Sequence, residues 1–462
     1  MVPDHFRFGG GAAESTILPV WAVFLLIGVL FLLILPRQKA IVPFILAFFT
    51  IPFGQVVVLG GFHFTALRVL ILAGLAKRLI PQSSPSEGKF PGGFNEIDRV
   101  TVWWPICAVT IFCLTFMEKQ AFINALGNLL DMLGGFLVVR YLIPDRQALR
   151  RAVKTLAVIC VIQGIPMIGE YFTSVNVFGY LGGVWIHSAI REGKVRAAGT
   201  LGALTAGPLA GMLIPLFLWL WTEKKSRMAA WVGLVAATSM VITSNSSTSW
   251  MAMIGSLVGL VFWRLRKKMR LVRWVFLCTL VALHLYMKAP VWALIARIDL
   301  TGSSSGYQRY ALLDMTIKHF SDWWLMGTPE YVEWGWDSYD LCNQFVAVAL
   351  TGGLLPLILY ISIFKRGFAA IGTARKLIEG DRRQEWFLWC LGSTLFATVV
   401  SYFGINSGAV LMIAFFILVS GICVAAWEAK QPAEHAVQVP AQERFPSRPA
   451  TVGAYLPFRE AK

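Results

Sequence analysis

Apolar runs of about 18 residues or more recur along the chain, and they constrain the fold more than any other feature of the sequence. Such a run is long enough to cross the ~30 Å hydrocarbon core of a membrane as a helix. The chain of 462 residues is 57% hydrophobic and only 14% charged, whereas a soluble domain has about a quarter of its residues charged. The sequence therefore predicts an all-α polytopic membrane protein.

The apolar runs predict about 12–13 transmembrane helices in a bundle over residues 17–427. The count is open by one or two because Pro43 and Pro52 fall in the second run, and Asn124, Asn128 and Asp131 fall in the fifth. The runs lie near 17–35, 41–59, 64–80, 100–117, 121–143, 152–172, 203–222, 228–244, 249–263, 272–287, 344–364, 386–403 and 408–427. No small-residue cleavage site follows the first run, so we expect an uncleaved first helix.

Six basic groups follow alternate apolar runs and account for the net charge of +16 without a nucleic acid partner. Lys and Arg favour the cytoplasmic side of a membrane protein. All six groups fall on that side if residues 1–16 form an external N-terminal segment and 428–462 a disordered cytoplasmic tail. The groups are Arg37/Lys39, Lys77/Arg78, 140–154, Lys224/Lys225/Arg227, 264–273 and 365–383.

Two long loops, 173–202 and 288–343, then lie on the extracytoplasmic face. Helices need only short connections, so long loops on one face indicate binding residues. Six of the seven Cys lie inside apolar runs, and the His residues are isolated. No metal spacing, phosphate-binding loop or dinucleotide motif is present, so we predict no metal and no cofactor.

The first loop carries three cations, Arg191, Lys194 and Arg196, on the side where cations are disfavoured. They fit contact with lipid headgroups and a clamp for substrate phosphate equally well.

The second loop predicts an amphipathic helix over 307–320. Tyr310, Leu313, Ile317 and Phe320 recur at helical spacing, and Arg309 faces elsewhere. This helix is predicted to lie in the headgroup plane. Lipid phosphate and substrate phosphate are both open as partners of Arg309. We interpret the tryptophans that follow as interfacial anchors: Trp323, Trp324, Trp334 and Trp336.

The polar run "DSYDLCNQF" (337–345) ends the second loop just before an apolar run. Asp340 is a candidate general base, because anionic headgroups repel a carboxylate at the membrane edge. It is an equally good candidate for a cap of the following helix. Cys342, Asn343 and Gln344 are candidate substrate-binding residues beside it.

Three stretches resemble the O-antigen ligase and O-antigen polymerase superfamily of bacterial membrane proteins. They are "VRAAGTLGALTAGPLAGMLIPLFLWLW" (195–221), "SSSGYQRYALLDMTIKHFSDWWLMGT" (303–328) and "DLCNQFVAVALTGGLLPLILYI" (340–361). The resemblance implies a GT-C-like fold in the cytoplasmic (inner) membrane of a bacterium. It also implies transfer of a glycan from a polyprenyl-pyrophosphate carrier to a lipid or glycan acceptor at the outer face.

The resemblance assigns the pyrophosphate to Arg196 and Arg309. Asp340 would then be the base and Asn343 would orient a sugar, with Arg191, Lys194, Gln344 and Cys342 also near the substrate. The chain departs from the family at Cys342, where many members carry His. Two alternatives therefore stay open: a transporter or flippase for lipid-linked sugars, and an inactive scaffold that assembles with other polysaccharide-synthesis proteins.

Overall fold

The fold is a helical bundle, described here from a computed structural model that covers residues 15–59, 62–80, 90–297, 305–335 and 340–431. Each of the apolar runs contains at least one helix. The predicted N-terminal segment 1–16 and tail 428–462 fall almost entirely outside the described residues.

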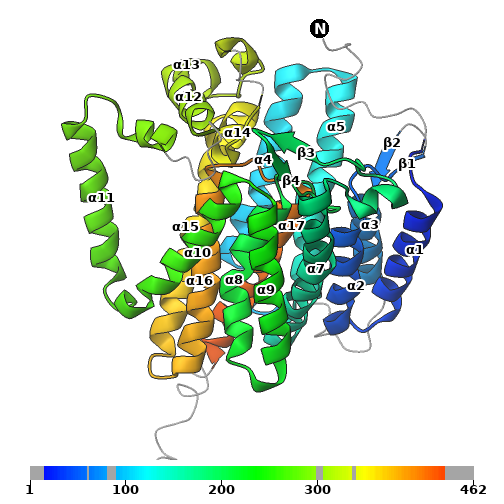
Figure 1. Ribbon diagram of the computed structural model, residues 1–462. Helices are drawn as coiled ribbons and strands as arrows, with labels where there is room; N and C mark the ends of the chain where they lie inside the picture. The colour runs from blue at the N-terminus through cyan, green and yellow to red at the C-terminus, as the bar shows by residue number, and fades with distance from the viewer. Residues whose placement is uncertain (1–14, 60–61, 81–89, 298–304, 336–339, 432–462) are drawn as a thin grey trace, which may run out of the picture.

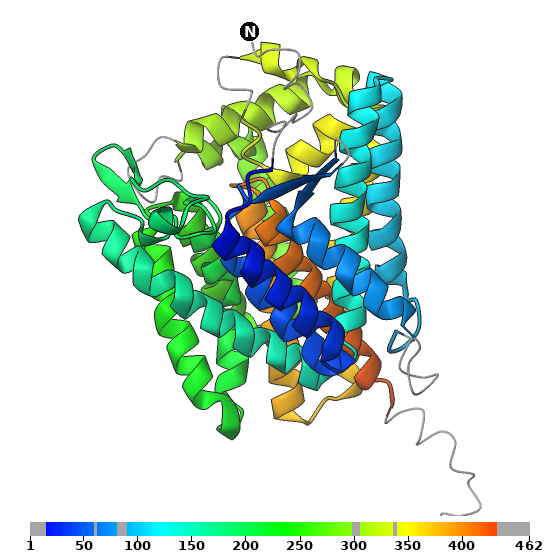
Figure 2. The same ribbon diagram turned by 90° about the vertical axis from the view of Figure 1, so that its right-hand side faces the viewer.

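The helices of the first half of the chain are α1 (Pro19–Ile34), α2 (Arg37–Thr50), α3 (Ala66–Leu79), α4 (Glu96–Phe116), α5 (Lys119–Leu129), α6 (Gly135–Leu142) and α7 (Arg146–Thr173). Among them, α1 and α7 pack against α2, and α4 packs against α5 (Figures 1 and 2).

The second half adds the longer loops and the centre of the bundle. Its helices are α8 (Ala206–Trp221), α9 (Arg227–Thr243), α10 (Ser247–Val261), α11 (Met269–Tyr286), α12 (Ser305–Lys318), α13 (Phe320–Trp323), α14 (Gln344–Gly352), α15 (Leu354–Leu377), α16 (Arg382–Tyr402) and α17 (Ala409–Glu428).

Eight of the described helices are long and apolar enough to cross a membrane, and two shorter helices, α1 and α8, are also apolar. This confirms a multi-pass, all-α membrane protein. One predicted span is wrong in its second half: α2 ends at Thr50, before Pro52, and a hairpin of β1 (Val56–Leu59) and β2 (Phe62–Thr65) follows. Proline lacks the backbone N–H that a continuing helix needs.

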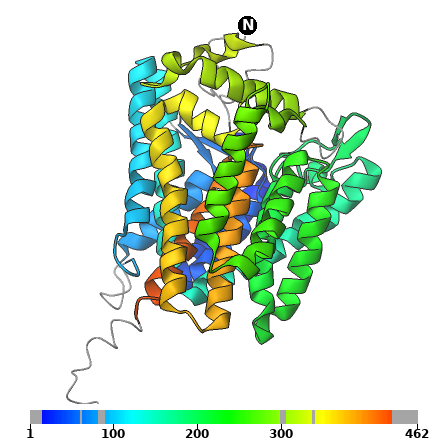
Figure 3. The same cartoon turned by 90° about the vertical axis from the view of Figure 1, so that its left-hand side faces the viewer.

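Burial separates the centre of the bundle from its edge. Most side chains of α17 are buried, and this helix contacts α6, α7, α15 and α16. By contrast α11 has no buried residue and stands at one side of the bundle, as Figures 1 and 3 show. An apolar helix that buries nothing within its own chain is suited to contact with lipid.

The six basic groups predicted to share one side do lie together at one end of the bundle, which we call the basic end. Hydrogen bonds, ion pairs and one cation–ring contact connect residues that belong to these groups or lie next to them. The contacts are Lys77 to the Leu35 carbonyl (2.6 Å), Arg37 to the Tyr141 carbonyl (2.7 Å), Arg150 to Glu223 (2.6 Å), Arg266 to Glu385 (3.0 Å), and Arg146 stacked 4.2 Å from the Phe387 ring centre.

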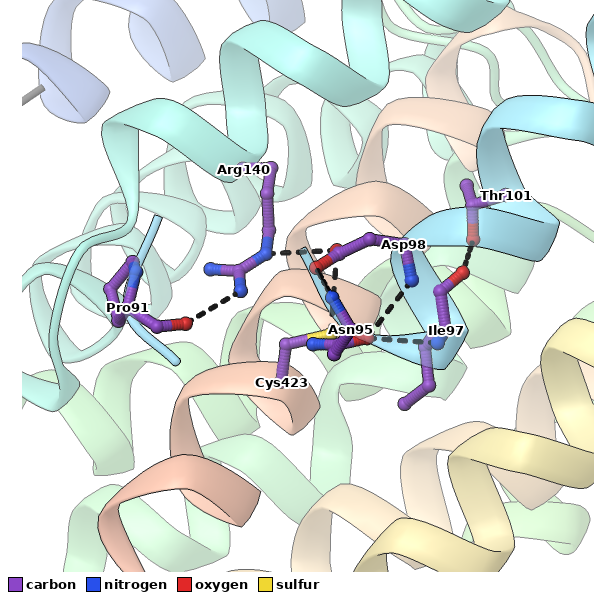
Figure 4. Close-up of polar contacts among 7 residues, drawn as sticks. All are labelled: Pro91, Asn95, Ile97, Asp98, Thr101, Arg140 and Cys423. Carbon is purple, nitrogen blue, oxygen red and sulfur yellow. Dashed lines mark hydrogen bonds and ion pairs between the residues drawn. The ribbon is translucent and has the colours of Figure 1, made fainter. Parts of the chain in front are cut away.

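A fully buried ion pair ties three helices together near the basic end (Figure 4). The Arg140 Nε of α6 donates to the Asp98 Oδ1 of α4 at 3.0 Å, and neither side chain is exposed to any extent. Asp98 also accepts a bond from the Asn95 backbone N–H, and the Cys423 thiol of α17 lies 3.8 Å from its Oδ1. Because a buried charge is costly without a partner, this pair fixes how α4 and α6 pack.

The predicted span 344–364 is broken into α14 and α15 at Gly353. This residue has a φ of +79°, a conformation that glycine tolerates and other residues rarely adopt. The break lets the backbone of the preceding loop approach closely: the Leu354 N–H donates to the Trp324 carbonyl and the Thr328 N–H donates to the Leu350 carbonyl, both at 2.8 Å. Two of the stretches that carry the family resemblance therefore pack directly on each other.

We expect Gly353→Ala to lower the free energy of unfolding by about 1–3 kcal/mol, because it strains the backbone. Its Cβ would also lie 2.7 Å from the Leu325 carbonyl oxygen. Gly372→Ala, inside the C-terminal part of α15 and with no neighbouring atom within 4 Å of its added Cβ, is the matched control. It is expected to be neutral or stabilising. Equal thermal unfolding midpoints for the two variants would contradict the strain argument.

Candidate functional site

The two long loops meet at the end of the bundle opposite the basic end, which we call the loop end. There α12 and α13 lie over α14, and these three helices share a small apolar core of Leu312, Trp323, Val346, Ala349 and Leu350 (Figure 1). The described helices of the second loop therefore form a layer over α14 at this end of the bundle.

The helix predicted over 307–320 is present as α12, followed by α13. It packs on the protein through Arg309, Leu312 and Thr316, which are buried, whereas Ile317 and Phe320 are exposed. Its position in the headgroup plane stays a prediction. The side that carries Arg309 and Thr316 finds hydrogen-bond partners in the protein. One partner is Trp323, whose indole N–H donates to the Thr316 carbonyl at 2.7 Å, so this tryptophan is a core residue and not an interfacial anchor.

Arg309 is only 6% exposed and lies against two short links between helices. Its Nη2 donates to the Thr248 Oγ1 at 2.9 Å and its Nε donates to the Gly404 carbonyl at 3.3 Å. Thr248 in turn donates to the same carbonyl at 3.0 Å. A side chain this buried has little contact with lipid headgroups. Burial therefore argues against lipid phosphate as the partner of Arg309.

The cations of the first loop lie on a small hairpin of β3 (Ala189–Arg191) and β4 (Lys194–Arg196). Two bonds seat this hairpin on the end of α9: the Asn245 side chain donates to the Val195 carbonyl at 2.7 Å, and the Ala197 N–H donates to the Thr243 carbonyl at 3.1 Å. Arg191 and Lys194 are exposed, and Arg196 is half-buried. The hairpin thus holds Arg196 in a half-buried position close to the end of α9.

The cations of the two loops share one electrostatic neighbourhood. Burial lowers the pKa of Arg309; Cys342 and Asp340 oppose this fall, and the positive charge of Arg191 adds to it. Burial also lowers the pKa of Arg196; the charges of Arg191 and Arg309 lower it further, and Glu192 opposes them. Guanidinium groups gathered in this way are a candidate site for an anion.

No carboxylate among the described residues lies within ion-pair distance of Arg309 or Arg196. Arg140, which is buried like Arg309, has a carboxylate partner, and so do the half-buried Arg68, Arg150 and Arg266. Buried Lys77 is held instead by the Leu33 and Leu35 carbonyls. Buried charges in proteins are normally paired. The loop end therefore holds positive charge that the described protein does not neutralise.

Asp340 lies near this positive charge with its side chain exposed. The alternative that it caps the next helix is wrong, because Asn343 is the cap: its Oδ1 accepts the N–H groups of Phe345 and Val346 at 2.9 and 3.3 Å. Gln344 is buried and accepts the Ser407 N–H at 2.6 Å. These contacts give Asn343 and Gln344 structural roles, whereas Asp340 is left available to solvent.

A pocket of about 750 Å³ opens beside the hairpin. Arg196 lines it, but Arg309 and Asp340 do not, so the three predicted catalytic residues share an electrostatic neighbourhood and not one cavity wall. Glu170 of α7 was not predicted from the sequence; it lies at the pocket and is fully buried. Its spacing of seven residues from Gln163 in one apolar run is the signal that could have found it.

Asp131, which interrupts the fifth apolar run, pairs with Arg68 of α3 rather than with a site residue. Arg68 Nη2 lies 2.9 Å from its Oδ2, and Arg68 also donates to the His63 carbonyl at 2.8 Å. Asp131 lies in a π-helix (Leu130–Gly134) beside a cavity of about 690 Å³ lined mainly by apolar side chains.

The remaining predictions for this end have mixed outcomes. Trp324 is exposed, as an interfacial anchor would be, and Trp334 stacks on His319 with ring centres 4.4 Å apart. Trp336 lies outside the described residues. Within the described ranges no group of three or more His, Cys, Asp or Glu side chains could hold a metal ion.

The chain matches no model of a known protein family, and no curated protein is significantly similar to it in sequence.

Proposed function

We propose that the protein transfers a glycan from a polyprenyl-pyrophosphate carrier to a lipid or glycan acceptor, in the manner of an O-antigen or exopolysaccharide ligase or polymerase. The observation that carries this proposal is that Arg309 and Arg196, at the loop end, have no carboxylate within ion-pair distance among the described residues, with the exposed Arg191 close to both. A pyrophosphate offers several oxygens to such guanidinium groups and lies at the membrane surface when it is attached to a polyprenol.

The transfer would be a direct displacement at the anomeric carbon of the donor. The acceptor hydroxyl forms the new C–O bond while the bond from that carbon to the pyrophosphate oxygen breaks. Polyprenyl pyrophosphate leaves with the electron pair, and Arg196 and Arg309 stabilise the charge that develops on it. The hydroxyl proton passes to the Asp340 carboxylate, which is exposed close to Arg309.

The packing of the three stretches that resemble the O-antigen ligase and polymerase superfamily supports this proposal. The first contributes Arg196, and the second contributes Arg309 and the loop that pairs with α14. The third contributes Asp340, α14 and Gly353. Segments far apart in the chain thus meet at the loop end. By the resemblance this end faces outward from the cytoplasmic membrane of a bacterium.

Reconstitution tests the proposal. Purified protein in lipid vesicles would be incubated with a polyprenyl-pyrophosphate oligosaccharide and an array of acceptors, including lipid A core and a second lipid-linked glycan. We expect a new glycosidic bond and release of polyprenyl pyrophosphate, both detected by mass spectrometry. Movement of the intact lipid between leaflets without a new bond would instead support transport.

Transport of lipid-linked sugars is the second candidate, because the Arg68–Asp131 pair lies among apolar helices beside a cavity. Ionisable residues inside membrane proteins commonly mark substrate pathways. This pair is weaker support for transport than the cations of the loop end are for glycan transfer. Arg68 is already bound by Asp131 and by the His63 carbonyl, so its charge has partners within the protein.

A further inference from the structure

The pocket beside the β3–β4 hairpin combines a size and a lining that suit a small ligand. Its volume of about 750 Å³ lies within the range of ligand sites, which span roughly 300–1,000 Å³. An aromatic ring, Trp185, and the polar side chains of His187, Ser188 and Arg196 share its wall.

The pocket floor is held by buried polar groups. The fully buried Glu170 carboxylate accepts the Ser188 hydroxyl at 2.8 Å and the N–H groups of Ala198 and Gly199 at 3.0 Å. The side-chain amide of Asn176, also buried, donates to the Gly199 carbonyl at 2.8 Å. These bonds give the pocket its shape before any ligand enters, which lowers the cost of binding.

Trp185 is 89% exposed although it lines this pocket, so its ring face is free to contact a ligand. The loop that carries it is anchored: the Trp21 indole of α1 donates to the carbonyls of Leu181 and Gly182 at 3.1 Å. An aromatic ring on a fixed loop offers a large contact area and loses little conformational entropy on binding.

This combination fits a sugar ring better than a hydrocarbon chain. One face of a pyranose is lined with C–H groups that stack on an aromatic ring, while its rim of hydroxyls both donates and accepts hydrogen bonds. Arg196 belongs to the pocket wall and to the anion site with Arg309. A ligand in the pocket would therefore lie directly next to a bound pyrophosphate.

We propose that this pocket binds the sugar residues nearest the pyrophosphate of the donor, with Trp185 stacked on one ring. The inference rests on the proposed function and deepens it by naming where the glycan part of the donor is recognised. Arg309 and Arg196 would then recognise the carrier, and Trp185 the glycan.

Three ligands separate these roles in titrations with the full chain in lipid nanodiscs. They are bare polyprenyl pyrophosphate, the same lipid with two or three hexose and N-acetylhexosamine residues, and the free oligosaccharide. Wild type should bind the glycan-bearing lipid about tenfold more tightly than the bare lipid, and Trp185→Ala should remove that gain while leaving bare-lipid binding unchanged. Saturation-transfer NMR should show contact with the free oligosaccharide in wild type but not in Trp185→Ala.

Tyr180→Ala is the matched control, since Tyr180 is an exposed aromatic on the same loop that does not line the pocket. It should retain the gain from the sugars. If the sugars add nothing to wild-type affinity, or if both variants lose affinity equally as membrane anchors would, the pocket proposal is overturned and the anion site stands. If the sugars bind through Trp185 but no transfer occurs, the proposed function fails and the pocket assignment stands.

Discussion

Arg309→Ala is expected to lower glycan transfer by about 10²–10³-fold, the effect typical of removing one group that stabilises developing negative charge. Arg309 is buried, bound only to Thr248 and the Gly404 carbonyl, and has no carboxylate within ion-pair distance in the described part of the chain. The charge is therefore available to a substrate anion. The rate would be measured in the vesicle assay at saturating donor, with the thermal unfolding midpoint followed in parallel.

A second substitution separates charge from geometry at the same position. Arg309→Lys keeps the positive charge. It cannot donate to the Thr248 hydroxyl and the Gly404 carbonyl in the same geometry, because an ammonium lacks the planar fork of a guanidinium. We expect it to retain more activity than the alanine variant and less than wild type.

Lys318→Ala is the control on the same helix. Lys318 is exposed and pairs with Asp314 at 2.7 Å, and ion pairs with an exposed partner contribute little to stability. Without Lys318, Asp314 would keep the hydrogen bond that it accepts from the Trp292 indole at 3.0 Å. It should leave both transfer and folding unchanged. Wild-type transfer by Arg309→Ala at an unchanged unfolding midpoint would rule out a role for this cation in the reaction.

The helices could be predicted from the sequence because apolar length alone determines whether a segment can span a membrane. The points at which these apolar runs depart from a continuous helix could not be predicted. Gly353 breaks a run that is apolar on both sides, and only its positive φ and the nearby Leu325 carbonyl explain why a glycine is needed there. The hairpin after α2 was likewise hidden, because β1 and β2 consist largely of the apolar residues that a helix would use.

The candidate site, like the fold, could be predicted only in part from the sequence. Charge placement singled out Arg196 and Arg309 in their loops, and the family resemblance assigned the pyrophosphate to them. In the folded chain the charge of Arg309 lowers the pKa of Arg196. The burial of Arg309 was not predictable, since it depends on Thr248 and Gly404 in links that are distant in sequence. The cap at Asn343 rather than Asp340 also depends on where α14 begins.

The second large effect is expected at the basic end, where Asp98→Asn should lower the free energy of unfolding by about 3–5 kcal/mol. This substitution preserves the shape of the side chain but leaves the Arg140 guanidinium buried without a counter-charge (Figure 4). The contacts that remain to Arg140 supply no negative charge: its guanidinium carbon lies 5.4 Å from the centre of the Phe90 ring. Its Nη2 donates to the Pro91 carbonyl at 3.1 Å, and its Nη1 has no hydrogen-bond partner among the described residues.

Two further variants make this prediction specific to the buried pair. Glu96→Gln removes a carboxylate from the first turn of the same helix, but Glu96 pairs with Arg366 at the exposed surface, so the cost should stay below about 1 kcal/mol. The double variant Asp98→Asn/Arg140→Gln removes both buried charges and should recover most of the lost stability. Unfolding midpoints in detergent would compare the four proteins. If the double variant is no more stable than Asp98→Asn, the loss comes from the helix cap at Asn95 rather than from the unpaired charge.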